Sequence, residues 1–305
     1  MEEYDIIIIG AGPAGLTAGI YAGRQGTKTL ILDKAVAGGA GLEVPLMENY
    51  PGFELIAGMS LIAKTKKQAE KNVVIKEMEG VESVEKINNG FEVKTSKNSY
   101  FGKSIIIASG TKHKLLEVPG EEKYKGYGVS YCATCDGLFY KDKNVLMIGG
   151  GNSAVQEAIF LKNVGCNVTL VHRRDELKAE DYLQRKLKEK KIPVIWNSFV
   201  KEIKGNKMVK SVVLSDKDGN TQEIEVHGIF IAIGDLPLNQ IAKELGVELD
   251  DNDYIITDKT QKTNVKNVYA AGDVTGGVKQ WIVSCGEGAV AATYAYHDLE
   301  NIKKE

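Results

Sequence analysis

Two cysteines three residues apart are the feature of this sequence most suggestive of chemistry. Cys132 and Cys135 enclose Ala133-Thr134, and Asp136 follows directly. Cysteines at this spacing can bridge within one helical turn, and a helix N-terminus lowers the pKa of a thiol. The carboxyl group of Asp136 is a candidate acid or base for thiol–disulfide exchange. The segment therefore predicts a redox-active pair with an adjacent proton-transfer group.

A zinc site is the alternative for such a pair. Tetrahedral zinc would need two further soft or imidazole ligands. The other cysteines, Cys166 and Cys285, are solitary. We expect Cys166 in the core, and Cys285 in the core or, as the alternative, in a flavin-facing C-terminal segment. The histidines show no ligand spacing; they are His113, His172, His227 and His297. The sequence thus favours redox chemistry and predicts no metal.

A glycine-rich loop near the N-terminus is typical of dinucleotide binding. The loop Gly10-Ala11-Gly12-Pro13-Ala14-Gly15 follows the apolar run Ile6–Ile9 and opens a helical pattern. In this fingerprint Gly10 permits the tight turn, Gly12 admits a pyrophosphate, and Gly15 allows close packing of helix and strand. The helix N-terminus supplies N–H groups for the phosphates. Asp33 closes the next strand, where a carboxylate accepts hydrogen bonds from ribose hydroxyls. The alternative is a tight turn without a ligand.

A second loop has the opposite charge preference. Gly149-Gly150-Gly151-Asn152-Ser153-Ala154 aligns without a gap to the first loop, and the position of Asp33 is taken by His172, followed by Arg173 and Arg174. A carboxylate there would repel a 2′-phosphate, whereas guanidinium groups bind one bidentately. The second loop therefore predicts a preference for NADPH over NADH, the alternative being a solvated basic turn.

These loops belong to a repeated α/β pattern. Short apolar strands alternate with helical segments in two series, and the expected elements are 6–9, 14–25 and 28–33, then 143–148, 152–163 and 166–171. A single repeat at this long spacing indicates two copies of one fold instead of a solenoid.

Bulk composition is that of an ordinary globular protein. The chain has 305 residues, enough for about two domains. Its 39 basic and 41 acidic residues give a formal net charge of −2, which offers no footprint for nucleic acid or an anionic membrane. The N-terminus lacks the pattern of a signal peptide, and no apolar run approaches the roughly 20 residues of a membrane span. We therefore expect a cytoplasmic protein.

Taken together, the motifs resemble the low-molecular-weight thioredoxin reductases over essentially the whole chain. The motifs that carry the resemblance are Gly10–Gly15, Glu48-Asn49-Tyr50-Pro51-Gly52, Ala108-Ser109-Gly110, Cys132–Gly137, Gly149–Ala154, His172-Arg173-Arg174 and Ala271-Gly272-Asp273. The resemblance implies a flavoprotein oxidoreductase that passes electrons from NADPH through FAD to Cys132–Cys135 and on to thioredoxin or a thioredoxin-like protein. It also implies a homodimer.

The same resemblance implies two Rossmann-like, three-layer α/β domains. A discontinuous FAD domain would comprise residues 1–115 and 243–305, and an inserted NADPH domain carrying the cysteine pair would comprise residues 116–242. Cys135 would face the flavin, Cys132 would attack the protein substrate, and Asp136 would donate the proton. Because NADPH, the cysteine pair and the protein substrate cannot all be served by one rigid arrangement, we expect a domain rotation with hinges near 113–118 and 238–244.

The resemblance also assigns the cofactor sites. The FAD site would comprise Gly10, Gly12, Pro13, Ala14, Gly15, Asp33, Lys34, Gly39, Ala40, Asn49, Ala108, Gly110, Gly272, Asp273, Lys279, Gln280 and Trp281. The NADPH site would comprise Gly149, Gly151, Asn152, Ser153, Ala154, His172, Arg173, Arg174 and Lys178.

Four positions depart from the family pattern. Ala40 replaces a glutamine near the flavin, Asp235 replaces a histidine in a Gly-His-x-Pro-Asn turn, and Lys178 replaces an arginine of the phosphate site. Trp281 stands where a small residue is common, either covering the flavin or filling core.

These departures leave alternatives open. The same relay could be fed by ferredoxin or a deazaflavin, or could serve a glutaredoxin-like or peroxiredoxin partner. A reading from another class is a flavin-binding redox sensor. The retained second glycine loop and arginine pair favour an NADPH-dependent enzyme.

Overall fold

The chain divides into two compact units in a computed structural model that describes residues 1–44, 47 and 49–302. The first unit comprises residues 1–112 and 236–305, and the second comprises residues 113–235. These boundaries fall a few residues before those expected from the sequence, at 115/116 and 242/243. Glu48, part of one family motif, lies outside the described residues.

The first unit is built on a mixed sheet. Its strand order is β3-β2-β1-β6-β5-β4, with β17 also paired to β6. The parallel strands are β1 (Glu2–Ile9), β2 (Thr29–Leu32), β3 (Val74–Lys76), β6 (Ser99–Ile107) and β17 (Val268–Ala270). An antiparallel extension is formed by β4 (Val81–Ile87) and β5 (Gly90–Thr95). The run 6–9 is buried on both faces, as expected for a central parallel strand.

Helices cover one face of this sheet. They are α1 (Pro13–Arg24), α2 (Gly58–Ala69) and α7 (Trp281–Ile302), with the short 3₁₀ helices η1 (Gly39–Glu43) and η3 (Asp273–Thr275) nearby in sequence. α1 and α7 pack closely because Gly288 has no side chain: a Cβ there would lie 2.1 Å from the carbonyl oxygen of Ala14. On the other face, apolar side chains of the sheet, among them those of β4 and β5, pack against residues around α6 (Gln240–Glu244).

The second unit is also an α/β fold, and it has three layers. Its parallel sheet has the order β11-β10-β9-β15-β8. The strands are β8 (Val129–Ser130), β9 (Asn144–Gly149), β10 (Asn167–Val171), β11 (Val194–Ile195) and β15 (Gly228–Ala232). One face packs on α4 (Asn152–Asn163) and α5 (Asp181–Glu189). The other packs on an antiparallel sheet of β12 (Ser198–Gly205), β13 (Val209–Asp216) and β14 (Thr221–Glu225).

The expected repeat is present in three dimensions. Helix α4 spans residues that correspond one for one to those of α1 at the sequence offset between the glycine loops. Both helices begin after an extended glycine that no side chain caps, Gly12 in the first unit and Gly151 in the second. The two-domain α/β architecture expected from the sequence is therefore confirmed.

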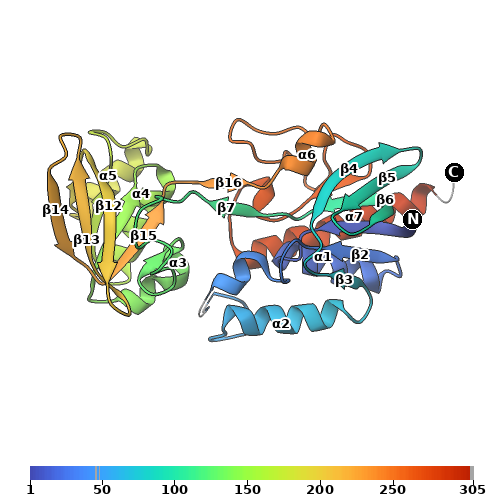
Figure 1. The fold of residues 1–305 in the computed structure, drawn as a ribbon, viewed down its shortest axis with the longest axis horizontal. Helices are drawn as coiled ribbons and strands as arrows, with labels where there is room; N and C mark the ends of the chain where they lie inside the picture. The colour runs from blue at the N-terminus through green and yellow to red at the C-terminus, as the bar shows by residue number, and fades with distance from the viewer. Residues whose placement is uncertain (45–46, 48, 303–305) are drawn as a thin grey trace. The chain divides into compact units, whose positions relative to one another are not determined.

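Two paired strands connect the units. β7 (Thr111–His113) and β16 (Asp235–Pro237) form a two-stranded sheet at the points where the chain passes from one unit to the other (Figure 1). Among the described residues, no helix is long and apolar enough to cross a bilayer.

Candidate active site

The cysteine pair forms a disulfide in the second unit. Cys132 and Cys135 are bonded, with their Cα atoms 5.3 Å apart, and Cys132 immediately precedes the one-turn helix α3 (Ala133–Asp136). The short 3₁₀ helix η2 (Gly137–Tyr140) follows. Within the part of the chain that is described, no group of three or more histidine, cysteine or acidic residues could hold a metal.

Asp136 has an environment suited to proton transfer. Its Oδ2 accepts a 2.6 Å hydrogen bond from the hydroxyl of Ser130, on the last residue of β8. Its Oδ1 is buried and has no hydrogen-bond partner among the described residues. Burial raises the pKa of Asp136, and the hydrogen bond from Ser130 opposes that shift. The proton-transfer group predicted from the sequence therefore lies beside the disulfide with a perturbed pKa.

A second carboxyl group contacts α3, which we call the redox helix because it carries Cys135. Glu157, on α4, accepts a 3.3 Å hydrogen bond from the backbone N–H of Ala133. Burial raises the pKa of Glu157 to about 7, aided by the charge of Asp235 and opposed by the Ala133 hydrogen bond and by His113. No motif in the sequence points to Glu157, because its contact depends on how α4 packs against α3.

Asp235, one of the four departures, has a partner in this structure. His113 Nδ1 lies 2.6 Å from Asp235 Oδ1 across the two strands β7 and β16. The ring of His113 stacks on Tyr131, the residue before Cys132, with centroids 4.8 Å apart. A carboxylate at position 235 thus ties the two connecting strands to the segment that carries the disulfide.

The first glycine loop forms an open cradle in the first unit. A Cβ on Gly10 would lie 2.3 Å from the carbonyl oxygen of Ala108, and one on Gly15 would lie 1.9 Å from that of Gly10. A Cβ on Gly12 would meet nothing within 4 Å. Gly10 and Gly15 are therefore required by packing, whereas Gly12 faces open space at the start of α1. Asp33 Oδ2 accepts a 2.7 Å hydrogen bond from the N–H of Ala11, which holds the carboxylate beside the loop.

Residues distant in sequence converge on the same cradle. A Cβ on Gly272 would lie 2.9 Å from the Cβ of Ala14, and one on Gly39 would lie 3.3 Å from Gly12 Cα. The Gly272-Asp273 turn is held from α7, where Ser284 donates to Asp273 and Glu287 accepts from the N–H of Gly272 at 2.7 Å.

The loop near Asn49 is connected to the start of α7. Asn49 Nδ2 donates a 3.0 Å hydrogen bond to Gln280 Oε1, and Lys279 donates one of 2.8 Å to the hydroxyl of Tyr254. Asn49 also lines a cavity of about 460 Å³ formed by residues 49–54.

Trp281 is partly buried against the core of the first unit. Its ring would lie 2.7 Å from a Cβ on Gly41 and makes an edge contact with Tyr50 at 6.3 Å. It packs partly buried against a cluster formed by Met47, Ile56 and Leu61. Of the remaining candidates, Lys34 and Ala40 are exposed and Gly110 adopts a positive φ of 70°.

The second glycine loop resembles the first in form and differs in charge. A Cβ on Gly151 would meet nothing within 4 Å. Arg173, Arg174 and Lys178 are exposed, and the N–H of Lys178 donates a 2.8 Å hydrogen bond to the carbonyl oxygen of Gly150. The backbone of Lys178 thus contacts the loop, and the two arginines follow His172, whose ring lies against Gly150.

His172 packs against the second glycine loop. It is 8% exposed, its Nδ1 lies 3.0 Å from the carbonyl oxygen of Gly149, and its ring leaves no room for a Cβ on Gly150. Burial lowers the pKa of His172, because its charged form loses solvation there. Asn152 is engaged in a mutual pair of 2.9 Å hydrogen bonds with Glu180.

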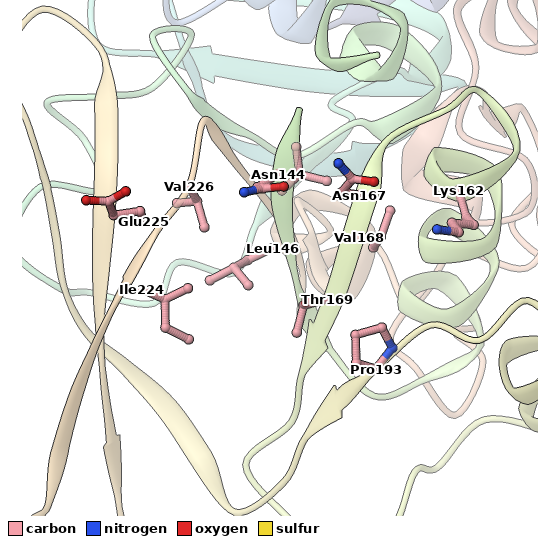
Figure 2. A pocket seen from close by; sticks show the side chains of 11 residues that line it. Asn144, Leu146, Lys162, Asn167, Val168, Thr169, Pro193, Ile224, Glu225 and Val226 are labelled. Atoms are coloured by element: carbon pink, nitrogen blue, oxygen red, sulfur yellow. The ribbon is translucent and has the colours of Figure 1, made fainter. Parts of the chain in front are cut away.

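A further cavity lies away from the second loop. It measures about 350 Å³ and is lined from the first residues of β9 and β10, Asn144 and Asn167, and from the end of β14 (Figure 2). The glycine loop follows the opposite, carboxyl end of β9, and none of the predicted site residues lines this cavity.

Comparison with known proteins assigns the chain to a family. The profile of the pyridine nucleotide-disulphide oxidoreductases matches residues 4–288, and the chain belongs to this family. Within it, the chain is similar to proteins named thioredoxin reductase from Listeria monocytogenes, at 39% identity over 99% of this chain and 95% of the relative, and from Bacillus subtilis, at 39% over 99% and 96%. The crystal structure of thioredoxin reductase from Streptococcus pyogenes superposes with a TM-score of 0.91 at 40% identity, covering 98% of this chain and 99% of that one.

Proposed function

We propose that the protein is an NADPH-dependent thioredoxin-disulfide reductase that contains FAD. The observation that carries the proposal is the Cys132–Cys135 disulfide beside the buried carboxyl group of Asp136, within the unit that also holds the basic nucleotide loop. A disulfide that only stabilises the fold needs no proton-transfer group beside it, whereas thiol–disulfide exchange does.

FAD suits the first unit. The cradle at Gly12 is open at a helix N-terminus, where N–H groups and the helix dipole favour a pyrophosphate. Asp33 would hold ribose hydroxyls, and Asp273 would hold the chain that leads to the flavin ring. When bound, FAD supplies the chemistry that joins a two-electron hydride donor to a disulfide.

NADPH suits the second unit. Gly151 offers an equivalent cradle, and Arg173 and Arg174 are exposed beside it to meet a 2′-phosphate. Lys178 would add charge without the bidentate geometry of an arginine. His172 would contribute by supporting the loop, since its ring is buried beneath Gly150.

The disulfide then passes electrons to a protein. In the proposed division of roles, Cys135 faces the flavin and Cys132 attacks the partner's disulfide. Leu138 and Phe139, on η2 directly after the redox helix, are 48% and 42% exposed. Exposed apolar side chains next to a reactive cysteine favour a protein substrate of the thioredoxin type over a small thiol.

Different half-reactions require different access to the flavin. The nucleotide loop and the disulfide both lie in the second unit, so a rotation of that unit about β7 and β16 is part of the proposal. We further propose a homodimer that works in the cytoplasm, where cysteine pairs are catalytic more often than structural.

The test is to separate the two half-reactions with Cys135→Ser. We expect NADPH to reduce the flavin in this variant at close to the wild-type rate, while steady-state reduction of thioredoxin falls to background. Cys166→Ala is the matched control, because Cys166 is a free, buried cysteine of the same unit. Thioredoxin reduction that survives Cys135→Ser would overturn the proposal.

A further inference from the structure

The hydroxyl group of Ser130 joins the two ends of the redox helix. It donates to Asp136 Oδ2 at 2.6 Å and accepts from the N–H of Cys132 at 3.1 Å. Ser130 is 7% exposed, and it pairs with Phe230 of β15 in the parallel sheet. The sheet of the second unit therefore fixes the position of the hydroxyl group. One side chain thus ties the backbone of the attacking cysteine to the proton-transfer carboxyl group.

We propose that Ser130 is a positioning residue that holds Asp136 so that its other oxygen, Oδ1, carries the proton exchanged during disulfide reduction. The inference rests on the proposed function of the disulfide and names a residue beyond the Cys132, Cys135 and Asp136 set. Ser130 has one proton to donate, and the short contact to Oδ2 commits that proton there.

The state of Oδ1 supports this assignment. It is buried and makes no hydrogen bond within the described part of the chain. An ionised oxygen in that position lacks compensation, whereas a protonated one is neutral and can donate to a sulfur. Burial raises the pKa of Asp136 and the Ser130 hydrogen bond moderates the rise, so Ser130 orients the carboxyl group and limits the shift of its pKa.

The exchange balances with these groups. The Cys132 thiolate attacks a partner disulfide, one partner S–S bond breaks and a mixed disulfide forms. The released partner thiolate takes the proton from Asp136. Cys135 then gives its proton to Asp136 and attacks the sulfur of Cys132, which re-forms the Cys132–Cys135 disulfide. The second partner thiolate takes that proton, and the two electrons of the enzyme dithiol end on the partner.

The experiment compares Ser130→Thr with Ser130→Val, which are nearly isosteric and differ in the hydroxyl group. The enzyme is reduced with a chemical dithiol, freed of it, and mixed in a single turnover across a pH series with a small aliphatic disulfide, whose released thiolate is basic enough to need a proton. Since this assay needs neither NADPH nor thioredoxin, its failure is distinguishable from failure of the proposed function. FAD content and the thermal midpoint verify folding.

We expect Ser130→Val to slow the exchange about tenfold and to move the pH midpoint of the acid group upward, while Ser130→Thr restores both. The matched control is Ser211→Val, because Ser211 is similarly buried and donates a 2.6 Å hydrogen bond to Glu223 in the same unit. Equal rates and pH profiles for Ser130→Val and Ser211→Val would overturn the proposal.

A measurement on the unaltered protein keeps the inference testable if the valine variant does not fold. Carbon-13 labelling of aspartate, with Asp136→Asn to assign the signal, reports the titration of this carboxyl group directly. The inference requires a pKa above that of an ordinary aspartate, and an ordinary or lowered pKa would contradict it.

Discussion

His113 and Asp235 form a side-chain pair across the two strands that connect the units, with Nδ1 and Oδ1 2.6 Å apart. Asp235 stands at the position of the histidine in the Gly-His-x-Pro-Asn pattern. The His113 ring stacks on Tyr131, the residue before Cys132. The connection between the units is thereby joined to the redox segment through specific side chains.

We expect His113→Ala and Asp235→Ala to be non-additive in the free energy of unfolding by about 1 kcal/mol, because each removes the partner of the other. A double-mutant cycle by urea denaturation measures this coupling. The control cycle uses Lys94 and Glu85, an exposed pair 3.0 Å apart, for which we expect a smaller coupling. Additive effects at positions 113 and 235 would show that the pair is incidental.

Gly12→Ala and Gly151→Ala form a matched pair for the two cradles. Neither Cβ would meet another atom within 4 Å, so both variants should fold. We expect Gly12→Ala to purify with reduced FAD, and Gly151→Ala to keep FAD and to bind NADPH more weakly, because each new methyl group occupies the approach of a pyrophosphate. Flavin absorbance and NADPH titration give the two readouts. Loss of FAD in both variants, or in neither, would argue against the assignment.

The basic pair beside the second loop should discriminate between nucleotides. For Arg173→Ala with Arg174→Ala we expect the Kd for NADPH to rise about 100-fold through the loss of charge-assisted hydrogen bonds, with NADH binding almost unchanged. The variant Lys207→Ala with Lys217→Ala removes the same charge from exposed positions of the second unit. An equal loss of affinity in this control would mean that only net charge matters.

Glu157 predicts a pH dependence of stability. Its pKa is raised from an ordinary value of 4.5 to about 7 in the folded state, so folding favours its protonated form. The loss of folding stability caused by Glu157 is absent below about pH 4.5. It grows between about pH 4.5 and 7 and stays at about 3 kcal/mol at higher pH. We expect Glu157→Gln to gain stability over the wild type across this range in urea denaturation. The exposed Glu189→Gln should track the wild type, and a constant difference for Glu157→Gln would refute the buried charge.

The parts of the site visible in the sequence are those in which chemistry constrains neighbouring residues. Both glycine loops and the cysteine pair are of this kind, and α1 and α4 begin where the loops place them. Contacts between distant residues gave no such signal. Asn49 and Gln280 are 231 residues apart, and His113 and Asp235 are 122 apart.

For Trp281 and His172, the surroundings of the side chain could not be predicted without the packing of the fold. The sequence left Trp281 either over the flavin or in the core, and its contacts with Gly41 and Tyr50 are visible only in the structure. His172 was expected among the NADPH-binding residues from its alignment with Asp33. Its ring is buried against Gly150, a placement that the sequence alone does not show.

The most direct test of the relay is an anaerobic titration of the FAD-loaded enzyme with NADPH and, separately, NADH, followed by oxidised thioredoxin. We predict that micromolar NADPH bleaches the flavin absorbance, that NADH does so only at much higher concentration, and that thioredoxin restores the absorbance. A flavin that stays oxidised with NADPH, or a reduced flavin that thioredoxin does not reoxidise, would contradict the account.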